Sequence, residues 1–304
     1  MNIKSAINFT NDSSGFKVTY NSPTRKFKDL REEFNNDALT LGKEGPVYIS
    51  FSAGVDSQII ARCFIDMKID AEFVFLYIKN HNEQEYQQVI ECEKYWGISV
   101  KKIELDLKKF KTKWIKDNQP NPVDSLVQYP FLYLSSQLEE SWPIVTQGKS
   151  EPALVGINPN KIAVYHNFYE AMELRFNLMN RYRTVYDFPF SPEAIASYYT
   201  DDNMKTFAST IKYFGNNNLQ FEGAPVQYNQ YYNTYAKPFV KGKYFKNDIL
   251  WFSKLTGAEK YPDWLLKMGF NPNTRVSVPY WDLVNFLSNE LDSSKDYKDW
   301  IFAQ

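Results

Sequence analysis

The stretch Val47-Tyr48-Ile49-Ser50-Phe51, followed at once by Ser52-Ala53-Gly54-Val55-Asp56-Ser57, decides the fold of this 304-residue chain. The first five residues form an almost continuous apolar run, which predicts a strand buried on both faces. The small and polar residues after it predict a tight turn. Ile59, Ile60 and Cys63 then recur on one helical face, so the turn is expected to open directly into a helix.

The same alternation of strands and helices continues on both sides of this stretch. Apolar residues at helical spacing precede it over 27–41, and further helices are predicted over 83–96 and 108–117. Buried strands are predicted over 73–78, 99–105 and 142–147. Short connections between such elements are typical of a parallel sheet. We therefore predict an α/β fold, in which a parallel sheet is flanked by helices and followed by a mostly helical C-terminal region.

Three regions are expected along the chain. Residues 1–23 are polar with short alternating stretches, which indicates an N-terminal arm or a hairpin. Residues 24–166 carry the α/β pattern, with a hairpin predicted near their end. Residues 167–304 are rich in aromatic residues and interrupted by prolines, and we expect them to be largely helical and to shape an acceptor site.

Composition excludes several classes of protein. The chain has 35 basic and 36 acidic residues, so its net charge of −1 argues against a general nucleic-acid binder and leaves only a local basic groove open. Two cysteines and two histidines exclude a disulfide scaffold and argue against a metal site built from these residues. No signal-peptide core or membrane-spanning apolar run is present, so we expect a cytoplasmic protein with no membrane partner. The oligomeric state, including a homodimer, is left open.

The loop 52–57 has the chemistry of an anion site. A parallel sheet binds ligands at the carboxyl ends of its strands, and a helix that starts there offers unpaired N–H groups and a positive dipole end. Ser52 and Ser57 can donate hydroxyl hydrogen bonds to phosphate oxygens. Asp56 would be repelled by phosphate, but it can act through a bridging Mg²⁺ ion. The alternative is a plain strand–helix turn with a polar cap.

This hexapeptide resembles the SGGxDS motif of the PP-loop ATP pyrophosphatases, the adenine nucleotide alpha hydrolase-like superfamily that includes asparagine synthetase. The motif is matched by Ser52, Gly54, Asp56 and Ser57. Ala53 departs from it, because the motif has a glycine at that position, and the Cβ of alanine resists a positive φ. The likeness covers roughly residues 24–166. It implies a fold of the HUP type, with ATP and Mg²⁺ as cofactors.

The resemblance also implies roles for individual residues. Residues 50–57 would bind the pyrophosphate of ATP, namely Ser50, Phe51, Ser52, Ala53, Gly54, Val55, Asp56 and Ser57. Asp56 would be catalytic through Mg²⁺. The backbone near Leu76, Tyr77 and Ile78, at the end of the next strand, would hold adenine.

A second glycine loop, Gly148-Lys149-Ser150-Glu151, follows the strand predicted over 142–147. By the same resemblance Gly148 and Lys149 would contact the nucleotide, Lys149 would neutralise charge in the transition state, and Glu151 would hold Mg²⁺ or orient an amine. Gly-Lys-Ser also ends a Walker A loop, but Pro143 stands where that motif needs its first glycine. A solvated loop lysine is the plain alternative for Lys149.

The expected function is ATP-dependent adenylation by a ligase that forms AMP and pyrophosphate. A carboxylate or carbonyl-type oxygen, on a small-molecule acceptor or a base, would attack the α-phosphate, and an amine or ammonia would then displace AMP. The alternatives are a nucleobase-modifying enzyme that acts on nucleic acid, which is less favoured, and a non-catalytic nucleotide-binding protein. Cys63 is expected to be buried on the apolar helix face, which disfavours sulfur transfer. Arg181 and Arg183 could form helical ion pairs or clamp an anion.

Overall fold

A parallel five-stranded sheet forms the centre of the molecule. The computed structural model describes residues 5–12, 15–118, 129–146, 153–158, 161–167, 183–210, 275–288 and 300–303. The strands of this sheet are β3 (Val47–Ser50), β4 (Ala71–Tyr77), β5 (Val100–Glu104), β6 (Ile144–Thr146) and β9 (Val185–Asp187). Their order in space is β5-β4-β3-β6-β9, and every neighbouring pair is parallel. This confirms the predicted α/β fold.

Side chains alternate between the two faces of the sheet, and each face has its own core. Val47 and Ile49 of β3 belong to the first core, while Tyr48 between them belongs to the second. Phe73 and Val74 of β4 divide in the same way. Because successive strand residues point to opposite faces, helices can cover the sheet on both sides.

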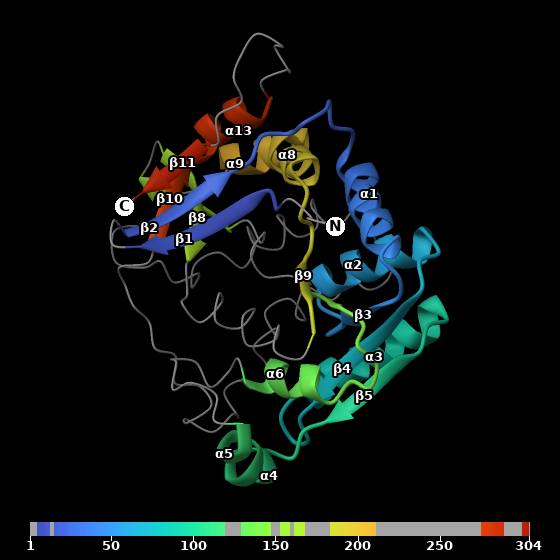
Figure 1. Ribbon diagram of the computed structural model, residues 1–304. Coiled ribbons are helices and arrows are strands. Elements are labelled where there is room, and N and C mark those ends of the chain that lie inside the picture. The colour runs from blue at the N-terminus through green and yellow to red at the C-terminus, as the bar shows by residue number, and fades with distance from the viewer. Residues whose placement is uncertain are drawn as a thin grey trace.

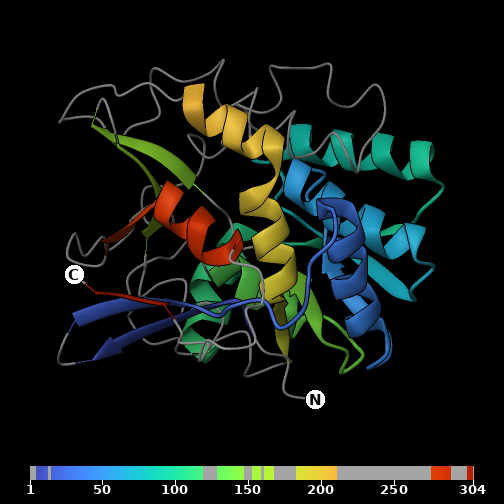
Figure 2. The ribbon, with the colours of Figure 1, turned by 90° about the horizontal axis from the view of Figure 1, so that it is seen from above.

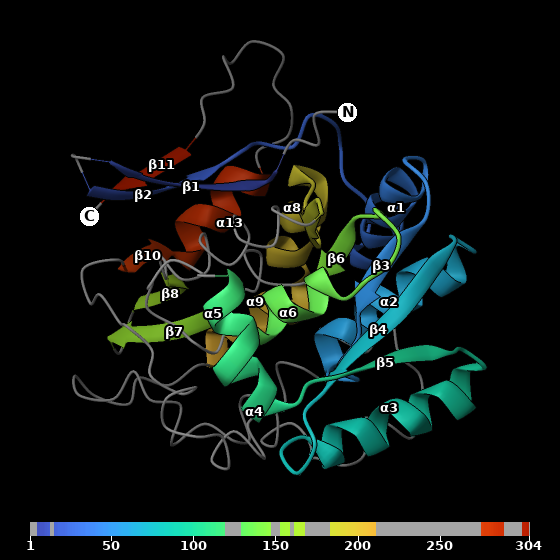
Figure 3. The ribbon, with the colours of Figure 1, turned by 60° about the horizontal axis from the view of Figure 1, so that its bottom comes forward.

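Three helices line the first core: α1 (Leu30–Gly42) precedes β3, α2 (Val55–Asp66) joins β3 to β4, and α3 (Glu83–Trp96) joins β4 to β5. The second core is closed by α4 (Leu107–Lys109), the π-helical turn η1 (Phe110–Trp114), α5 (Ile115–Asn118) and α6 (Tyr129–Ser136). Figure 1 and Figure 3 place α4, α5 and α6 together, away from α1. The sheet is therefore sandwiched between two helical layers.

Two small antiparallel sheets complete the described part of the fold. The first has the order β1-β2-β11, in which β1 (Ile7–Asp12) and β2 (Gly15–Tyr20) form a hairpin and β11 (Trp300–Ala303) pairs with β2. The second has the order β10-β8-β7, formed by β7 (Ala153–Asn158), β8 (Lys161–Asn167) and β10 (Arg275–Pro279). Figure 2 shows the blue hairpin on the opposite side of the molecule from α3.

These pairings bring distant parts of the chain together. The N-terminal hairpin, the second of the two forms expected for residues 1–23, is extended by the last described strand. The expected boundary at residue 166 runs through β8, and β9, from beyond it, joins the central sheet. The described helices of the C-terminal region are α8 (Pro192–Thr200), α9 (Asp202–Thr210) and α13 (Tyr280–Ser288), and α8 packs on α1. Helices expected elsewhere between 168 and 274 lie outside the described residues.

No helix in the described ranges combines the length and the apolar character that a membrane span requires.

Candidate functional site

The loop 51–54 leaves the carboxyl end of β3 at the middle of the sheet. The chain turns from β3 through α2 to β4 on one side, whereas β6 and β9 lie on the other side of β3. The strand order therefore reverses between β3 and β6. In open parallel sheets this reversal opens a crevice in which ligands bind, and the loop lies beside it.

Ala53 adopts the left-handed backbone conformation, which favours glycine. Its φ is 57°, and its side chain is buried. A non-glycine residue in this region costs roughly 1 kcal/mol, so the surrounding structure must hold it there. Gln58 contributes, because its Nε2 donates to the Ala53 carbonyl oxygen at 2.6 Å. The turn therefore accommodates an alanine at this position despite its Cβ.

The two serine hydroxyls meet inside the turn. The Ser57 Oγ donates to the Gly54 carbonyl oxygen at 2.9 Å, and the Gly54 N–H points to the Ser52 Oγ at 3.4 Å. The two Oγ atoms are 3.5 Å apart. This places both hydroxyls at the start of α2, where an anion would also meet the first N–H groups of the helix.

The N-terminus of α2 has no side-chain cap of its own. Its N-cap residue is Gly54, which has an extended backbone and supplies no side-chain acceptor. By contrast, Asp29 caps α1 and Ser191 caps α8 with side-chain oxygens. The first N–H groups of α2 therefore lack the side-chain acceptor that α1 and α8 have.

Asp56 lies in the first turn of α2 and is buried. A single carboxylate next to a phosphate loop suits Mg²⁺, which binds proteins through one or two carboxylates and takes its other ligands from phosphates and water. No cluster of three metal-ligating side chains occurs among the described residues.

The backbone expected to hold adenine is engaged by a side chain that sequence reasoning missed. The Ile78 N–H donates to the Asn82 Oδ1 at 2.8 Å, and the Asn82 Nδ2 donates to the Leu76 carbonyl oxygen at 2.9 Å. The Tyr77 carbonyl oxygen accepts from the Leu105 N–H at 2.8 Å. An asparagine just before a helix is a known local backbone binder, so its position was the available signal.

The second glycine loop begins at the same edge of the sheet. β6 pairs in parallel with β3 and ends at Thr146, so the chain leaves it beside the loop 51–54. Gly148, Lys149 and Glu151 themselves lie outside the described residues. Their roles remain predictions.

Arg183 has a structural role rather than an anion-binding one. Its guanidinium donates to the carbonyl oxygens of Ser135, Leu138, Glu140 and Trp142 at 2.8–3.1 Å. All of its nitrogens are thereby used to hold the connection from α6 to β6. Arg181 lies outside the described residues.

Both cysteines are buried. Burial raises the pKa of the Cys63 thiol well above its usual value and that of Cys92 to about 12. Because the thiolate is the reactive form, neither residue is suited to sulfur transfer.

Comparisons with known proteins give only partial likenesses. The chain matches no protein-family model and no curated protein. Among solved structures, the NMN synthetase from Francisella tularensis is similar at 16% identity, with a TM-score of 0.31 over 41% of this chain and 57% of that chain. A predicted subunit of tRNA methyltransferase from Methanocaldococcus jannaschii is similar at 17% identity, with a TM-score of 0.30 over 54% of this chain and 74% of that chain. The match thus spans little more than half of the NMN synthetase, and likenesses of this size transfer no reaction or substrate.

Proposed function

We propose that the protein is an ATP-dependent adenylating enzyme that cleaves ATP to AMP and pyrophosphate. The observation that carries the proposal is the turn at the carboxyl end of β3. It combines a left-handed Ala53, two converging serine hydroxyls and a helix that starts at Gly54. These are the features from which a protein builds a phosphate cradle.

In this proposal the loop binds the β- and γ-phosphates, which leave as pyrophosphate. Ser52, Ser57 and the first N–H groups of α2 donate hydrogen bonds to them, and Asp56 holds Mg²⁺ that arrives with ATP. Lys149 stabilises the charge that develops on the leaving group, and Glu151 supports the metal. Adenine lies against the end of β4, near Leu76–Ile78. Because Asn82 already binds the Ile78 N–H and the Leu76 carbonyl oxygen, we propose that the base packs on this strand end rather than pairing with those two groups.

The acceptor supplies a carboxylate or carbonyl-type oxygen that attacks the α-phosphate. The bond from this phosphorus to the bridging oxygen breaks, pyrophosphate departs, and an adenylated acceptor forms. An amine or ammonia then adds to the activated carbon, loses a proton and displaces AMP, as in an amide ligase. In this proposal the reaction takes place in the cytoplasm, and the acceptor is a small molecule.

The test is a product analysis with Mg²⁺ and ATP labelled at the α- and γ-phosphates, in the presence of ammonia and a fractionated metabolite extract. AMP with labelled pyrophosphate supports the proposal. ADP with phosphate, in a preparation free of other ATPases, overturns it in favour of a Walker-type reaction. Failure to bind Mg·ATP in a calorimetric titration overturns the nucleotide site itself, whereas binding without cleavage favours the non-catalytic alternative.

A further inference from the structure

A strongly basic surface follows β5 at the same edge of the sheet as the phosphate loop. The segment α4–η1–α5 carries five lysines that are all exposed, and we call them the lysine surface: Lys108, Lys109, Lys111, Lys113 and Lys116. With Asp106 and Asp117 at its ends, the segment has a local charge of +3 in a chain whose net charge is −1. Such a concentration of like charges is unfavourable unless a partner or solvent screens it.

These lysines differ from the two on the neighbouring strand. Lys101 lies 3.6 Å from Glu72 and 3.4 Å from Glu139, and Lys102 lies 3.8 Å from Glu104. Within the described ranges, no carboxylate comes within ion-pair distance of Lys108, Lys109, Lys113 or Lys116. The charge on the strand is thus neutralised internally, while most of the charge on the lysine surface is available to a partner.

The apolar side chains of the same segment pack against the rest of the fold. Phe110 is buried, and its ring stacks on Trp114 with centroids 5.2 Å apart. Both rings also contact Tyr133 of α6, at 5.8 and 5.7 Å. The segment therefore has no free apolar face to insert into a lipid surface, as an interfacial helix requires.

The arrangement of the lysines indicates what kind of partner the lysine surface binds. Lys109, Lys113 and Lys116 recur at i, i+4 and i+7 along this segment, so about one helical turn separates each from the next, and we call these three residues the stripe. Protein interfaces are depleted of lysine and need an apolar centre, which the exposed residues here do not provide. Phosphate backbones, by contrast, are bound by rows of lysine and arginine.

The location connects this surface to the proposed reaction. β5 and β3 are separated by β4 alone, so their carboxyl ends lie about 10 Å apart at the usual strand spacing. Figure 3 shows α4 and α5 beside α6, at the end of the molecule toward which β5 leads. A polymer on the lysine surface would therefore reach the edge that carries the phosphate loop.

We propose that the lysine surface binds the phosphate backbone of a polynucleotide, which presents a carbonyl-type oxygen of a base to the ATP site. The binding part of this proposal stands on the lysine surface alone. The part that concerns the acceptor rests on the proposed adenylation. Of the two acceptor classes, small molecules and bases, it assigns the acceptor to a nucleic-acid base.

The test compares two triple variants of the full chain that carry the same change in net charge. The first, Lys109→Gln/Lys113→Gln/Lys116→Gln, neutralises the stripe. The control, Lys43→Gln/Lys68→Gln/Lys94→Gln, neutralises three exposed lysines near the opposite edge of the sheet. Lys43 and Lys68 lie on the connections that enter β3 and β4, and Lys94 lies in the last turn of α3, before β5. Binding of a labelled single-stranded RNA oligonucleotide is followed by fluorescence anisotropy over a series of salt concentrations, without ATP.

We expect the stripe variant to bind about 100-fold more weakly than the unmodified chain at 0.1 M salt, and its slope of log affinity against log salt to be smaller by about 2. The control variant should retain the affinity and the slope. Equal losses in both variants overturn the proposal, as does the absence of RNA binding by the unmodified chain. Binding to vesicles containing phosphatidylserine, without binding to RNA, also overturns it.

The two proposals fail in distinguishable ways. A chain that forms no AMP, yet binds RNA through the stripe, retains the lysine surface and loses the adenylation. A chain that forms AMP with a small-molecule acceptor and binds no RNA retains the adenylation and loses this inference. AMP formation that requires RNA and is diminished only in the stripe variant supports both.

Discussion

The starts of α2 and α8 are built in opposite ways. At α8 the chain supplies its own acceptors: Ser191 Oγ accepts from the Ala194 N–H at 3.1 Å, and Asp37 Oδ2 accepts from the Phe190 and Ser191 N–H groups at 2.9 and 3.1 Å. At α2 the N-cap is Gly54, which has no side chain. The comparison shows that side chains of this chain occupy the first N–H groups of α8, whereas no side-chain cap occupies those of α2, where we propose that a ligand binds.

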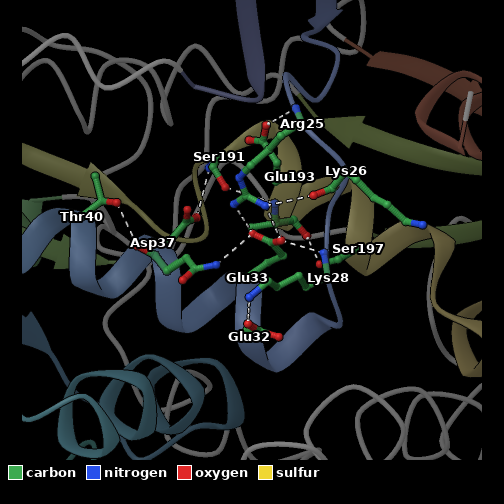
Figure 4. A network of polar contacts seen from close by, with 12 residues as sticks. Arg25, Lys26, Lys28, Glu32, Glu33, Asp37, Thr40, Ser191, Glu193 and Ser197 are labelled. Carbon is green, nitrogen blue, oxygen red and sulfur yellow. Dashed lines mark hydrogen bonds and ion pairs between the residues drawn. The ribbon is translucent and has the colours of Figure 1, made fainter. Parts of the chain in front are cut away.

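The closed start belongs to a wider clamp, shown in Figure 4. Glu193 in the first turn of α8 accepts from the Thr24 N–H at 2.7 Å, and Arg25 forms two hydrogen bonds with Glu33 of α1 at 2.7 and 2.6 Å. The segment before α1 is thereby tied to both α1 and α8. We expect changes here to alter stability, and changes at α2 to alter nucleotide chemistry.

The largest effect is expected at the open start. Asp56→Asn should lower the rate of AMP formation by about 100-fold, because it removes the charge that positions Mg²⁺. The matched control is Asp70→Asn, at an exposed aspartate on the opposite edge of the sheet, which should leave the rate unchanged. Equal rates for Asp56→Asn and the unmodified chain would contradict the metal role.

The clamp should respond in the reverse way. Arg25→Met leaves the buried Glu33 carboxylate without its bidentate partner, and we expect a loss of about 2 kcal/mol, discounted because the arginine is half exposed. Urea unfolding measures this loss. The affinity for Mg·ATP, measured by calorimetry, should stay unchanged, and a parallel loss of affinity would erase the distinction between the two helix starts.

The start of α8 should also make the stability of the chain depend on pH. Burial raises the pKa of Asp37 to about 7, against the hydrogen bonds of Phe190 and Ser191, which favour the charged form. The folded chain then holds a proton that the unfolded chain has lost between about pH 4 and pH 7. Stability should therefore fall as pH rises through this window, by up to roughly 1.4 kcal/mol per pH unit.

Asp37→Asn keeps an oxygen acceptor for both N–H groups and removes the titration. The unfolding free energy of this variant should be less dependent on pH than that of the unmodified chain, with Asp70→Asn again as the control. Identical pH profiles for Asp37→Asn and the unmodified chain would show that Asp37 does not titrate in the folded state.

The smallest effect is expected at Ala53. Ala53→Gly relieves the left-handed strain but adds freedom to the unfolded chain, so a net gain of about 0.5 kcal/mol is expected. Ala61→Gly in the middle of α2 is the matched control and should destabilise by about 1 kcal/mol or more. Thermal unfolding shows whether each variant is more or less stable than the unmodified chain. A loss of stability in Ala53→Gly would mean that the turn is not strained.

Much of the central layer could be predicted because its signals are local. The helix predicted over 83–96 is α3 with the same bounds. The four strands predicted from apolar runs are all present in the central sheet: β3, β5 and β6 are shorter than predicted, whereas β4 begins two residues earlier. The resembled motif has a glycine at the position of Ala53, which agrees with the left-handed backbone found there.

The residues around the site were harder to predict from the sequence. The roles of Gln58 and Asn82 depend on which backbone atoms the folded loop turns toward them.

The sequence by itself determined that a buried strand turns through small polar residues into a helix, because hydrophobic period and turn chemistry act over a few residues. Only the tertiary structure decided that Asp37 of α1 closes the start of α8, 153 residues away in the sequence. It also paired β11 with β2 and brought β9 into the central sheet. These pairings depend on contacts between segments that are distant in the sequence. Closing the loops between them costs entropy, which is offset only when the whole core forms, so no local pattern predicts the pairings.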